Sequence, residues 1–254
     1  MIHSETRGQG DDLILIHGWG MHGGIWGPIV ERLAERHRVT TLDLPGHGYS
    51  PMPAGGFDLP RLASLLLNEL PRPATWIGWS LGGMVALEAA LQQAGAVERL
   101  VLVAALPQFV QSPDWPDAMP RGTLASFATN LERDYATTLK RFLALQVRGA
   151  DNERQLRRLI QQQVASRPPA DPEALRLGLE ILRNANLRPR LGQLQPPLKL
   201  ILGERDMLVP VAAGCATQAL IPQAQCTICP GAGHAPFLSH SDYFLSEVEV
   251  FIKP

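Results

Sequence analysis

The sequence predicts an α/β fold, in which a mostly parallel central sheet is flanked by helices and interrupted by an inserted all-helical segment. Toward both ends of the chain, short apolar runs rich in branched residues alternate with stretches of helical spacing. Such alternation is typical of parallel strands joined by crossover helices. Between about residues 107 and 191 the alternation stops, and only helical patterns remain.

The predicted elements fall into two groups. The strands are expected at residues 13–16, 39–42, 74–77, 100–103, 198–202 and 225–229, with helices at 26–36, 58–70, 81–93, 211–220 and 241–252. The inserted helices are expected at 124–134, 136–147, 153–165 and 172–184. We therefore expect a core domain made of residues 1–106 and 192–254. Residues 107–191 would form a helical cap over the carboxyl edge of the sheet, where open α/β sheets bind their ligands.

The bulk composition fits a globular chain. Its 254 residues are 45% hydrophobic and 19% charged, with a formal net charge of −1, which gives no reason to expect a nucleic-acid partner. No apolar run approaches the roughly 20 residues that cross a bilayer, and the first residues lack the apolar centre of a signal peptide. With only three cysteines, we expect a cytoplasmic protein without a disulfide framework, and a monomer that does not associate with membranes.

A candidate nucleophile follows the predicted strand at 74–77. Gly78-Trp79-Ser80-Leu81-Gly82 matches the G-x-S-x-G elbow, in which a serine occupies a strained turn between a strand and a helix. Small neighbours are needed because the strand and the helix pass closely at this turn. A serine hydroxyl is a weak nucleophile unaided, so this interpretation requires a base, an acid and an oxyanion site elsewhere in the chain.

The base and the acid should follow in the order Ser, Asp or Glu, His. Of the seven histidines, His234 lies in a glycine-rich loop after the last predicted strand, whereas His240 fits a surface or capping position. Asp206 lies just past the strand at 198–202, and its rival Glu204 fits a turn residue that faces solvent. We predict Ser80, Asp206 and His234 as a catalytic triad.

Backbone amides should supply the oxyanion site. The first donor would be Leu81, directly after the serine, and the second would be Trp19 in the loop His17-Gly18-Trp19-Gly20 after the first strong strand. His17 is expected to brace this loop rather than transfer protons. Trp79 is interpreted as the variable residue of the elbow.

Cys226 and Cys229 form a C-x-x-C pattern within the last predicted strand. No second Cys or His pair follows at zinc spacing, so the pattern favours buried structural cysteines. We predict no metal and no organic cofactor.

Five stretches, in order along the chain, carry a resemblance: HGWG, DLPGHGYS, GWSLGG, GERD and GAGHAPF. With these marks the sequence resembles the α/β-hydrolase superfamily across nearly its whole length. Within that superfamily it resembles the pimeloyl-[acyl-carrier protein] methyl ester esterases of biotin synthesis. The closer resemblance rests on HGWGMHGGIW, GWSLGGMVAL, RFLALQ, GLEIL and GHAPFLSH. RFLALQ and GLEIL discriminate best because they lie in the predicted cap, where members of the superfamily diverge.

The resemblance implies the α/β-hydrolase fold and a serine carboxylesterase that releases methanol from a carrier-bound pimeloyl methyl ester. It implies the same triad, with Trp19 and Leu81 at the oxyanion and ester end. It also implies an acyl channel lined by Phe142, Leu143, Ala144, Leu145 and Gln146.

The resemblance further implies that an acidic acyl carrier protein docks on the cap through Arg141, Arg154 and Arg158. The charge distribution agrees, because residues 121–190 hold 13 Lys and Arg against 7 Asp and Glu in a chain of net charge −1. One arginine of the family corresponds to Thr137 here, although Lys140 lies nearby.

Other functions fit parts of the pattern. A general carboxylesterase for short free esters would use the same triad, as would a cofactor-free haloperoxidase-like side activity. A catalytically silent hydrolase-fold binding protein is the alternative from another class.

Overall fold

The computed structural model, which describes residues 1–150 and 152–253, is built on a seven-stranded sheet of order β1-β3-β2-β4-β5-β6-β7. The strands are β1 (Ser4–Arg7), β2 (Asp12–Ile16), β3 (Arg38–Leu42), β4 (Ala74–Trp79), β5 (Val97–Val103), β6 (Leu198–Gly203) and β7 (Gln225–Cys229). Every pairing is parallel except that of β1 with β3. The α/β prediction is confirmed, with β4 at the centre of the sheet.

The exposed edge strand β1 is absent from the sequence prediction. Its residues are exposed along their whole length, and the segment Ser4–Arg7 contains no apolar run that would mark a strand. The other six strands fall where the apolar runs predict them. Strands β2 to β6 are largely buried, whereas β7 at the other edge is only partly buried.

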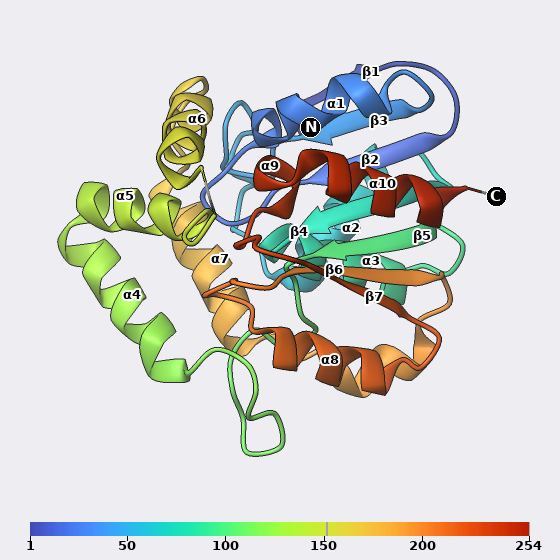
Figure 1. Cartoon of the computed structure of the whole chain (residues 1–254). Coiled ribbons are helices and arrows are strands. Elements are labelled where there is room, and N and C mark those ends of the chain that lie inside the picture. The colour runs from blue at the N-terminus through green and yellow to red at the C-terminus, as the bar shows by residue number, and fades with distance from the viewer. Residues whose placement is uncertain (151, 254) are drawn as a thin grey trace.

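Helices cover both faces of the sheet (Figure 1). Alternate strand residues enter two apolar clusters, one shared with α2, α3 and α8 and the other shared with α1, α9 and α10. The core helices are α1 (Gly27–Leu33), α2 (Leu59–Glu69), α3 (Leu81–Gln92), α8 (Val211–Leu220), α9 (Pro236–Ser239) and α10 (Ser241–Ile252), with 3₁₀ turns η1 (Gly23–Trp26) and η2 (Arg188–Gln193). Within the described residues, no helix is long and apolar enough to cross a membrane.

Four further helices gather at one end of the sheet (Figure 1). They are α4 (Arg121–Arg133), α5 (Tyr135–Leu145), α6 (Glu153–Ala165) and α7 (Pro172–Asn184). The segment between β5 and β6 contains no strand among its described residues, only two isolated bridges. The carboxyl ends of β2, β4, β6 and β7 lead into the loops beneath these helices, so residues that follow four separate strands meet there.

Candidate active site

Ser80 lies on a strained turn between β4 and α3. Its backbone angles are φ 55° and ψ −118°, a conformation that non-glycine residues rarely adopt and that is maintained only where the surroundings enforce it. Its amide donates to the carbonyl of Val103 on the neighbouring strand at 2.9 Å. The turn therefore presents Ser80 at the carboxyl end of the central strand.

Glycines make this turn sterically feasible. A Cβ on Gly78 would lie 2.4 Å from the carbonyl oxygen of Gly82, and a Cβ on Gly82 would lie 2.4 Å from the carbonyl oxygens of Ile16 and His17. The first turn of α3 is thus packed directly on the end of β2, next to the predicted oxyanion loop. The G-x-S-x-G spacing reflects these contacts.

The two predicted oxyanion donors lie on either side of Ser80. Leu81 is the first residue of α3, and amides of the first helical turn have no partner within their own helix. A Cβ on Gly18 would lie 3.2 Å from the Cβ of Ser80, so the loop that carries Trp19 passes directly against the serine. The structure brings Trp19, Ser80 and Leu81 together.

Asp206 and His234 form a buried pair. His234 Nδ1 lies 2.8 Å from Asp206 Oδ2, and the two side chains are 1% and 0% exposed. The amides of Leu208 and Val209 donate to the other carboxylate oxygen, Oδ1, at 2.7 and 3.0 Å. With Nδ1–H donating to the carboxylate, Nε2 is left unprotonated.

Ser80 and His234 are related in this structure through Trp79 and are not hydrogen-bonded to each other. The buried Nε2 of His234 has no hydrogen-bond partner among the described residues. Trp79, next to Ser80, donates its indole N–H to the carbonyl of His234 at 2.8 Å. The elbow is therefore tied to the histidine loop by a bond from the residue next to Ser80.

Trp79 has more than the variable role interpreted from the sequence. Its ring also contacts the rings of Trp26 and Phe237, with centroids 6.5 and 5.1 Å away. It belongs to the core beneath His234. The pattern G-x-S-x-G carries no signal for this role, because x accepts many residues.

The alternatives to Asp206 and His234 are not part of the buried pair. Glu204 is exposed, and its Oε2 accepts the amide of Gly231 at 2.8 Å. His240 occupies the cap position of α10 with its Nδ1 2.9 Å from Ser239 Oγ. As predicted, Glu204 faces solvent and His240 occupies a capping position.

His17 braces the oxyanion loop, which confirms its predicted role. Its Nε2 accepts the amide of Leu44 at 2.8 Å, and its Nδ1 lies 2.8 Å from the carbonyl of Gly18. Burial, followed by the nearby His47, lowers the pKa of His17 to about 3. A neutral imidazole with both nitrogens occupied holds the end of β2 against the loop after β3.

Residues of α4, α5 and α7 hold the Trp19 side chain in place. Its indole N–H donates to the carbonyl of Leu175 at 2.8 Å. The rings of Phe127 and Phe142 meet it edge-on, with centroids 5.4 and 5.0 Å away. Phe127 was not predicted, since an apolar residue on an amphipathic helix gives no sign of the ring that it meets.

Gly178 on α7 permits this approach. A Cβ there would lie 2.8 Å from the Trp19 ring and 3.3 Å from the Leu81 side chain. The glycine of the GLEIL stretch therefore lets α7 lie directly over both predicted oxyanion residues. The contact explains why a glycine occupies a helix interior, where it is otherwise unfavourable.

The predicted acyl-channel residues divide between two sides of α5. Phe142 and Leu145 pack toward Trp19 and the larger apolar cluster, whereas Leu143 packs in the cluster beneath the histidine loop. Ala144 is half-buried. Gln146 is 1% exposed and donates to the carbonyl of Phe142 at 3.0 Å. Phe142 is the member of this set whose ring contacts the Trp19 ring.

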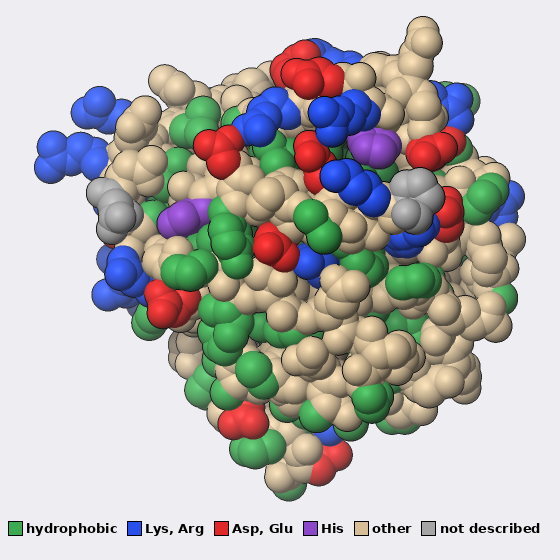
Figure 2. Space-filling view, turned by 45° about the vertical axis from the view of Figure 1, so that its right-hand side comes forward, with side chains coloured by type: hydrophobic (Ala, Val, Ile, Leu, Met, Phe, Trp, Pro, Cys, Tyr) green, Lys and Arg blue, Asp and Glu red, His purple; other side chains and the backbone are tan. Residues whose placement is uncertain are grey.

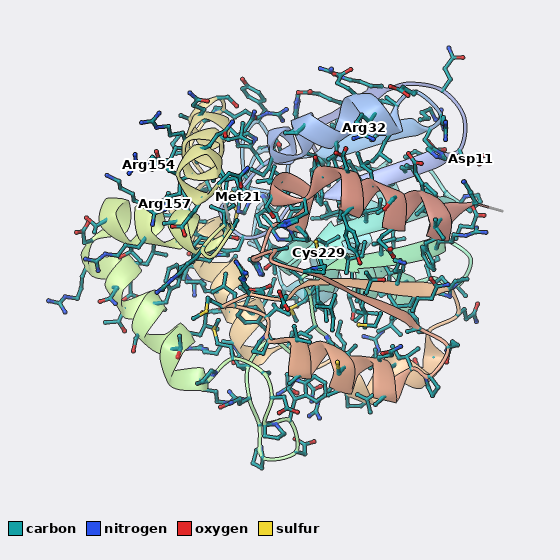
Figure 3. The ribbon with its side chains drawn as sticks, in the orientation of Figure 1. Asp11, Met21, Arg32, Arg154, Arg157 and Cys229 are labelled. Atoms are coloured by element: carbon teal, nitrogen blue, oxygen red, sulfur yellow. The ribbon has the colours of Figure 1, made fainter. Side chains whose placement is uncertain are left out.

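The three arginines predicted to contact a carrier are exposed on α5 and α6. Arg154 and Arg158 line a surface groove of about 690 Å³ together with Leu159 and with Leu238 of α9. Figure 3 shows Arg154 and its neighbour Arg157 on the outer side of α6, away from the sheet. Arg157 is paired with Glu153 at 3.0 Å.

A buried ion pair, also missed from the sequence, joins the α6–α7 connection to the core. The Arg167 guanidinium donates to both oxygens of Asp43 at 2.8 and 2.9 Å. Burial opposes ionisation of Asp43, but amide donors from Tyr49 and Gly23, with His17 and Arg167 nearby, hold its pKa below its usual value. A pairing across 124 residues leaves no local pattern.

The C-x-x-C cysteines occupy one strand, β7. Residues three apart on a strand point to opposite faces, and Cys226 packs on the larger cluster whereas Cys229 is fully buried. Burial raises the pKa of each thiol to about 11. Among residues 1–150 and 152–253, no group of three or more His, Cys, Asp or Glu side chains is arranged to hold a metal ion.

Comparison with models of protein families identifies the family to which this chain belongs. The model of the alpha/beta hydrolase family matches residues 13–247. The chain belongs to the α/β-hydrolase family. The match spans the whole sheet apart from β1, and it includes the elbow, the Asp206 loop and the His234 loop.

Curated relatives narrow the family. The chain is 48% identical over 248 residues to pimeloyl-[acyl-carrier protein] methyl ester esterase of Methylococcus capsulatus, covering 98% of this chain and 97% of the relative. It is 43% identical over 253 residues to the protein of the same name from Xanthomonas oryzae pv. oryzae, covering 99% and 98%. The chain belongs to the family of these esterases.

A solved structure supports the fold independently. An esterase from Exiguobacterium antarcticum superposes with a TM-score of 0.90 over 100% of this chain and 96% of the other, at 22% sequence identity. At that identity the likeness concerns the fold alone.

Proposed function

We propose that the chain hydrolyses the methyl ester of a pimeloyl group carried by acyl carrier protein, with Ser80, Asp206 and His234 as its triad. The chain is a carboxylic ester hydrolase by family. The observation that carries the residue assignment is the buried His234–Asp206 pair, 2.8 Å apart, whose remaining ring nitrogen has no partner among the described residues. The carbonyl of His234 accepts the indole N–H of Trp79, the residue next to Ser80. This is the arrangement required of a general base next to a nucleophile.

The reaction follows from these positions. His234 Nε2 takes the proton of Ser80 as the hydroxyl attacks the ester carbonyl, and Asp206 stabilises the imidazolium. The amides of Trp19 and Leu81 donate to the developing oxyanion, each contributing about 3 kcal/mol of transition-state stabilisation. Methanol leaves with the proton from His234. Water, activated by the same histidine, then releases the free carboxylate and restores Ser80.

We propose that residues 107–191 act as the cap that selects the substrate. Trp19 is contacted by side chains of α4 and α5 and by a backbone carbonyl of α7, so we expect an acyl chain that reaches Ser80 to pass beneath these helices. Phe142 to Gln146 would line its path. An aromatic wall without a fixed charge suits the methylene groups of a pimeloyl chain.

Carrier docking is proposed for the outer faces of α5 and α6. Arg141, Arg154 and Arg158 are exposed there, and basic side chains steer an acidic partner toward its site. By contrast, the face seen in Figure 2 carries basic and acidic side chains interspersed. Thr137 is also exposed on α5, with Lys140 as the nearby cation.

The catalytic assignment is tested by covalent labelling and substitution. A fluorophosphonate should label Ser80, and Ser80→Ala should lose both labelling and ester hydrolysis while its circular dichroism spectrum and Tm stay unchanged. Retained hydrolysis in Ser80→Ala would overturn the assignment. Absence of labelling in the wild-type protein would favour a silent binding protein.

The substrate is tested by comparing the carrier-bound methyl ester with a short free ester. Charge reversal at Arg154 and Arg158 should raise KM for the carrier-bound ester about tenfold and leave the free ester unaffected. Arg36→Glu makes the same charge change on an exposed residue before β3, at the opposite edge of the sheet, and is the matched control. Equal kinetics in the wild type and in the single variants Arg154→Glu, Arg158→Glu and Arg36→Glu would remove carrier docking from this face.

A cell-based test addresses the proposed role in biotin synthesis. The wild-type gene should restore growth without biotin to a bacterial strain that lacks its own pimeloyl methyl ester esterase, and Ser80→Ala should not. Growth with Ser80→Ala would contradict the proposal.

One observation favours a second candidate function, the hydrolysis of free esters. A groove of about 810 Å³ between α4 and α7 has a floor of Leu124, Leu175 and Leu179. Leu175 also holds the Trp19 indole, so the groove borders the ester end, and its volume lies in the range of small-molecule sites. Ala128→Trp would fill it from α4. The second candidate predicts a higher KM for long-chain free esters in this variant, with short esters unaffected.

We propose a cytoplasmic, monomeric protein. The three cysteines are free thiols in the described structure, which fits a reducing compartment. Size-exclusion chromatography with light scattering would test the monomer.

A further inference from the structure

The backbone turn that joins α5 to α6 lies against both loops of the catalytic pair. The amide of Ala235, next to His234, donates to the carbonyl of Gln146 at 3.0 Å. The guanidinium of Arg205, next to Asp206, donates to the carbonyl of Gly149 at 2.6 Å. Two carbonyls three residues apart on one turn thus hold the neighbours of the base and of the acid.

The two catalytic loops are also bonded to each other through Arg205. Its amide donates to the carbonyl of Ala232 at 2.8 Å. The loops pass so closely that a Cβ on Gly203 would lie 2.0 Å from the carbonyl oxygen of Gly233. Arg205 therefore contacts the histidine loop with its backbone and the α5–α6 turn with its side chain.

The turn is itself firmly seated. Val147 is 0% exposed and Ala150 is 6% exposed, so its two ends are anchored in the core. Between them Gly149 has φ +85°, and its amide donates to Glu153 at the start of α6. A Cβ on Gly233 would lie 3.0 Å from the carbonyl oxygen of Arg148, so the turn also forms a wall against the histidine loop.

We propose that Arg205 is a positioning residue for ester hydrolysis. By pinning the Asp206 loop to the Gly149 carbonyl, it keeps the carboxylate at its distance from His234 Nδ1 and keeps Nε2 directed toward Ser80. The inference rests on the proposed catalytic roles of these three residues, and it goes beyond them by assigning the α5–α6 turn a part in catalysis.

The arrangement links the acyl-lining helix to the catalytic pair. Gln146 ends the stretch proposed to line the acyl channel, and its carbonyl is the group that holds Ala235. Arg154 and Arg158 follow on α6 after the same turn. Substrate contacts on α5 or α6 therefore act on a turn that has two bonds to the catalytic loops.

The test compares Arg205→Ala and Arg205→Lys with Arg148→Ala. Arg148 is exposed in the same turn, so its substitution removes an equal charge and spares the bond to Gly149. With a short free ester, Arg205→Ala should lower kcat about tenfold or more with KM changed less than about twofold, because misplacement of reacting groups by about 1 Å costs up to 10²-fold. Arg205→Lys keeps one donor and should recover part of kcat. Arg148→Ala should match the wild type.

Two further readouts separate positioning from simple loss of stability. The low-field proton resonance of His234 Nδ1–H, followed by NMR, should shift or broaden in Arg205→Ala and not in Arg148→Ala. In Arg205→Ala, the acidic limb of the pH profile of kcat/KM should also shift. A kcat within about twofold of wild type, with an unchanged resonance and a lowered Tm, would overturn the proposal and leave Arg205 a structural residue.

The free ester keeps this test separate from the substrate proposal. A wild-type protein that hydrolyses the short ester and ignores the carrier-bound ester fails the substrate proposal alone, and the Arg205 comparison still decides positioning. If Ser80 of the wild-type protein is not labelled and no ester is hydrolysed, both the substrate proposal and the Arg205 proposal fail.

Discussion

The loop around His17 and the loop around His234 are built from the same parts, but their imidazoles have different hydrogen-bond partners. Each follows a parallel strand and carries a buried imidazole. The first loop passes against Ser80 at Gly18, and the second is bonded to Trp79, the residue before Ser80. In the first loop, both ring nitrogens are hydrogen-bonded to backbone groups. In the second, Nδ1 faces a carboxylate and Nε2 has no partner among the described residues.

The difference is the reason why we propose His234, and not His17, as the general base. A histidine between two backbone groups has no lone pair left for a proton, and burial holds the pKa of His17 at about 3. A histidine with a carboxylate on Nδ1 has a lone pair on Nε2 and a stabilised imidazolium. The chemistry follows from the partners of the ring rather than from its burial.

The largest expected effect comes from removing the reactive ring. His234→Gln should lower kcat about 10⁵-fold or more, because base and nucleophile act as a unit. Fluorophosphonate labelling of Ser80 should fall in parallel, while the urea midpoint changes little. A kcat within about 100-fold of wild type would mean that another group accepts the proton, and the comparison with His17 would fail.

The next effect comes from the partner of that ring. Asp206→Asn should lower kcat about 10⁴-fold, because an amide at this position no longer holds the required tautomer or stabilises the imidazolium. The bond to the Leu208 and Val209 amides uses the other oxygen, so the loop should stay folded. Steady-state kinetics with a short ester, alongside Tm, measures both. Glu204→Gln is the control and should keep full activity.

The sequence alone predicted much of the difference between His17 and His234. Ser80, Asp206 and His234 follow separate predicted strands in the order required of this fold, and parallel strands bring their carboxyl ends to one edge. The helices Glu153–Ala165 and Pro172–Asn184 were predicted to the residue, since both show strong apolar periodicity. The predicted bounds of β7, α8 and α10 also match the structure. The bounds of other elements differ by a few residues, as with α4, which begins at Arg121 rather than Leu124.

What escaped prediction depends on contacts between distant segments. Trp79 gained a role only through the carbonyl of His234, 155 residues away. Arg167 reached Asp43, and Phe127 reached Trp19, across similarly long separations. Side-chain type at one position does not reveal the partner that tertiary packing supplies. The exposed strand β1 escaped for the opposite reason, because it has too little burial to leave an apolar pattern.

For His17, which braces the oxyanion loop, we expect a smaller effect on kcat and a distinctive pH dependence of stability. His17→Gln should lower kcat far less than His234→Gln does and should lower the free energy of unfolding by about 1–3 kcal/mol near pH 7.5, since buried hydrogen bonds are disturbed. The folded-state pKa of His17 is about 3, below its ordinary value of 6.5. The unfolded chain therefore binds a proton that the folded chain does not between these values, and stability falls as pH falls.

That linkage gives a measurable signature. The His17 contribution lowers wild-type stability by about 1.4 kcal/mol per pH unit below 6.5, and His17→Gln lacks it. Urea unfolding at about pH 7.5, 6 and 5 should show the gap between the two proteins narrowing as the solution becomes more acidic. A gap that stays constant or widens would contradict the assignment of a buried neutral imidazole.

The smallest expected effect tests whether an unpartnered nitrogen is enough to make a base. His47 is 1% exposed, and its Nε2, like that of His234, has no partner among the described residues. Its Nδ1, however, faces the carbonyl of Pro45 at 3.1 Å rather than a carboxylate, and burial lowers its pKa. His47→Leu should keep kcat within about twofold. Its stability should change by about 1 kcal/mol or less, because removing an unsatisfied buried group offsets the lost bond to Pro45. A tenfold loss of kcat at unchanged Tm would show that the lone nitrogen matters, and the carboxylate partner would then cease to be what separates His234 from the other buried rings.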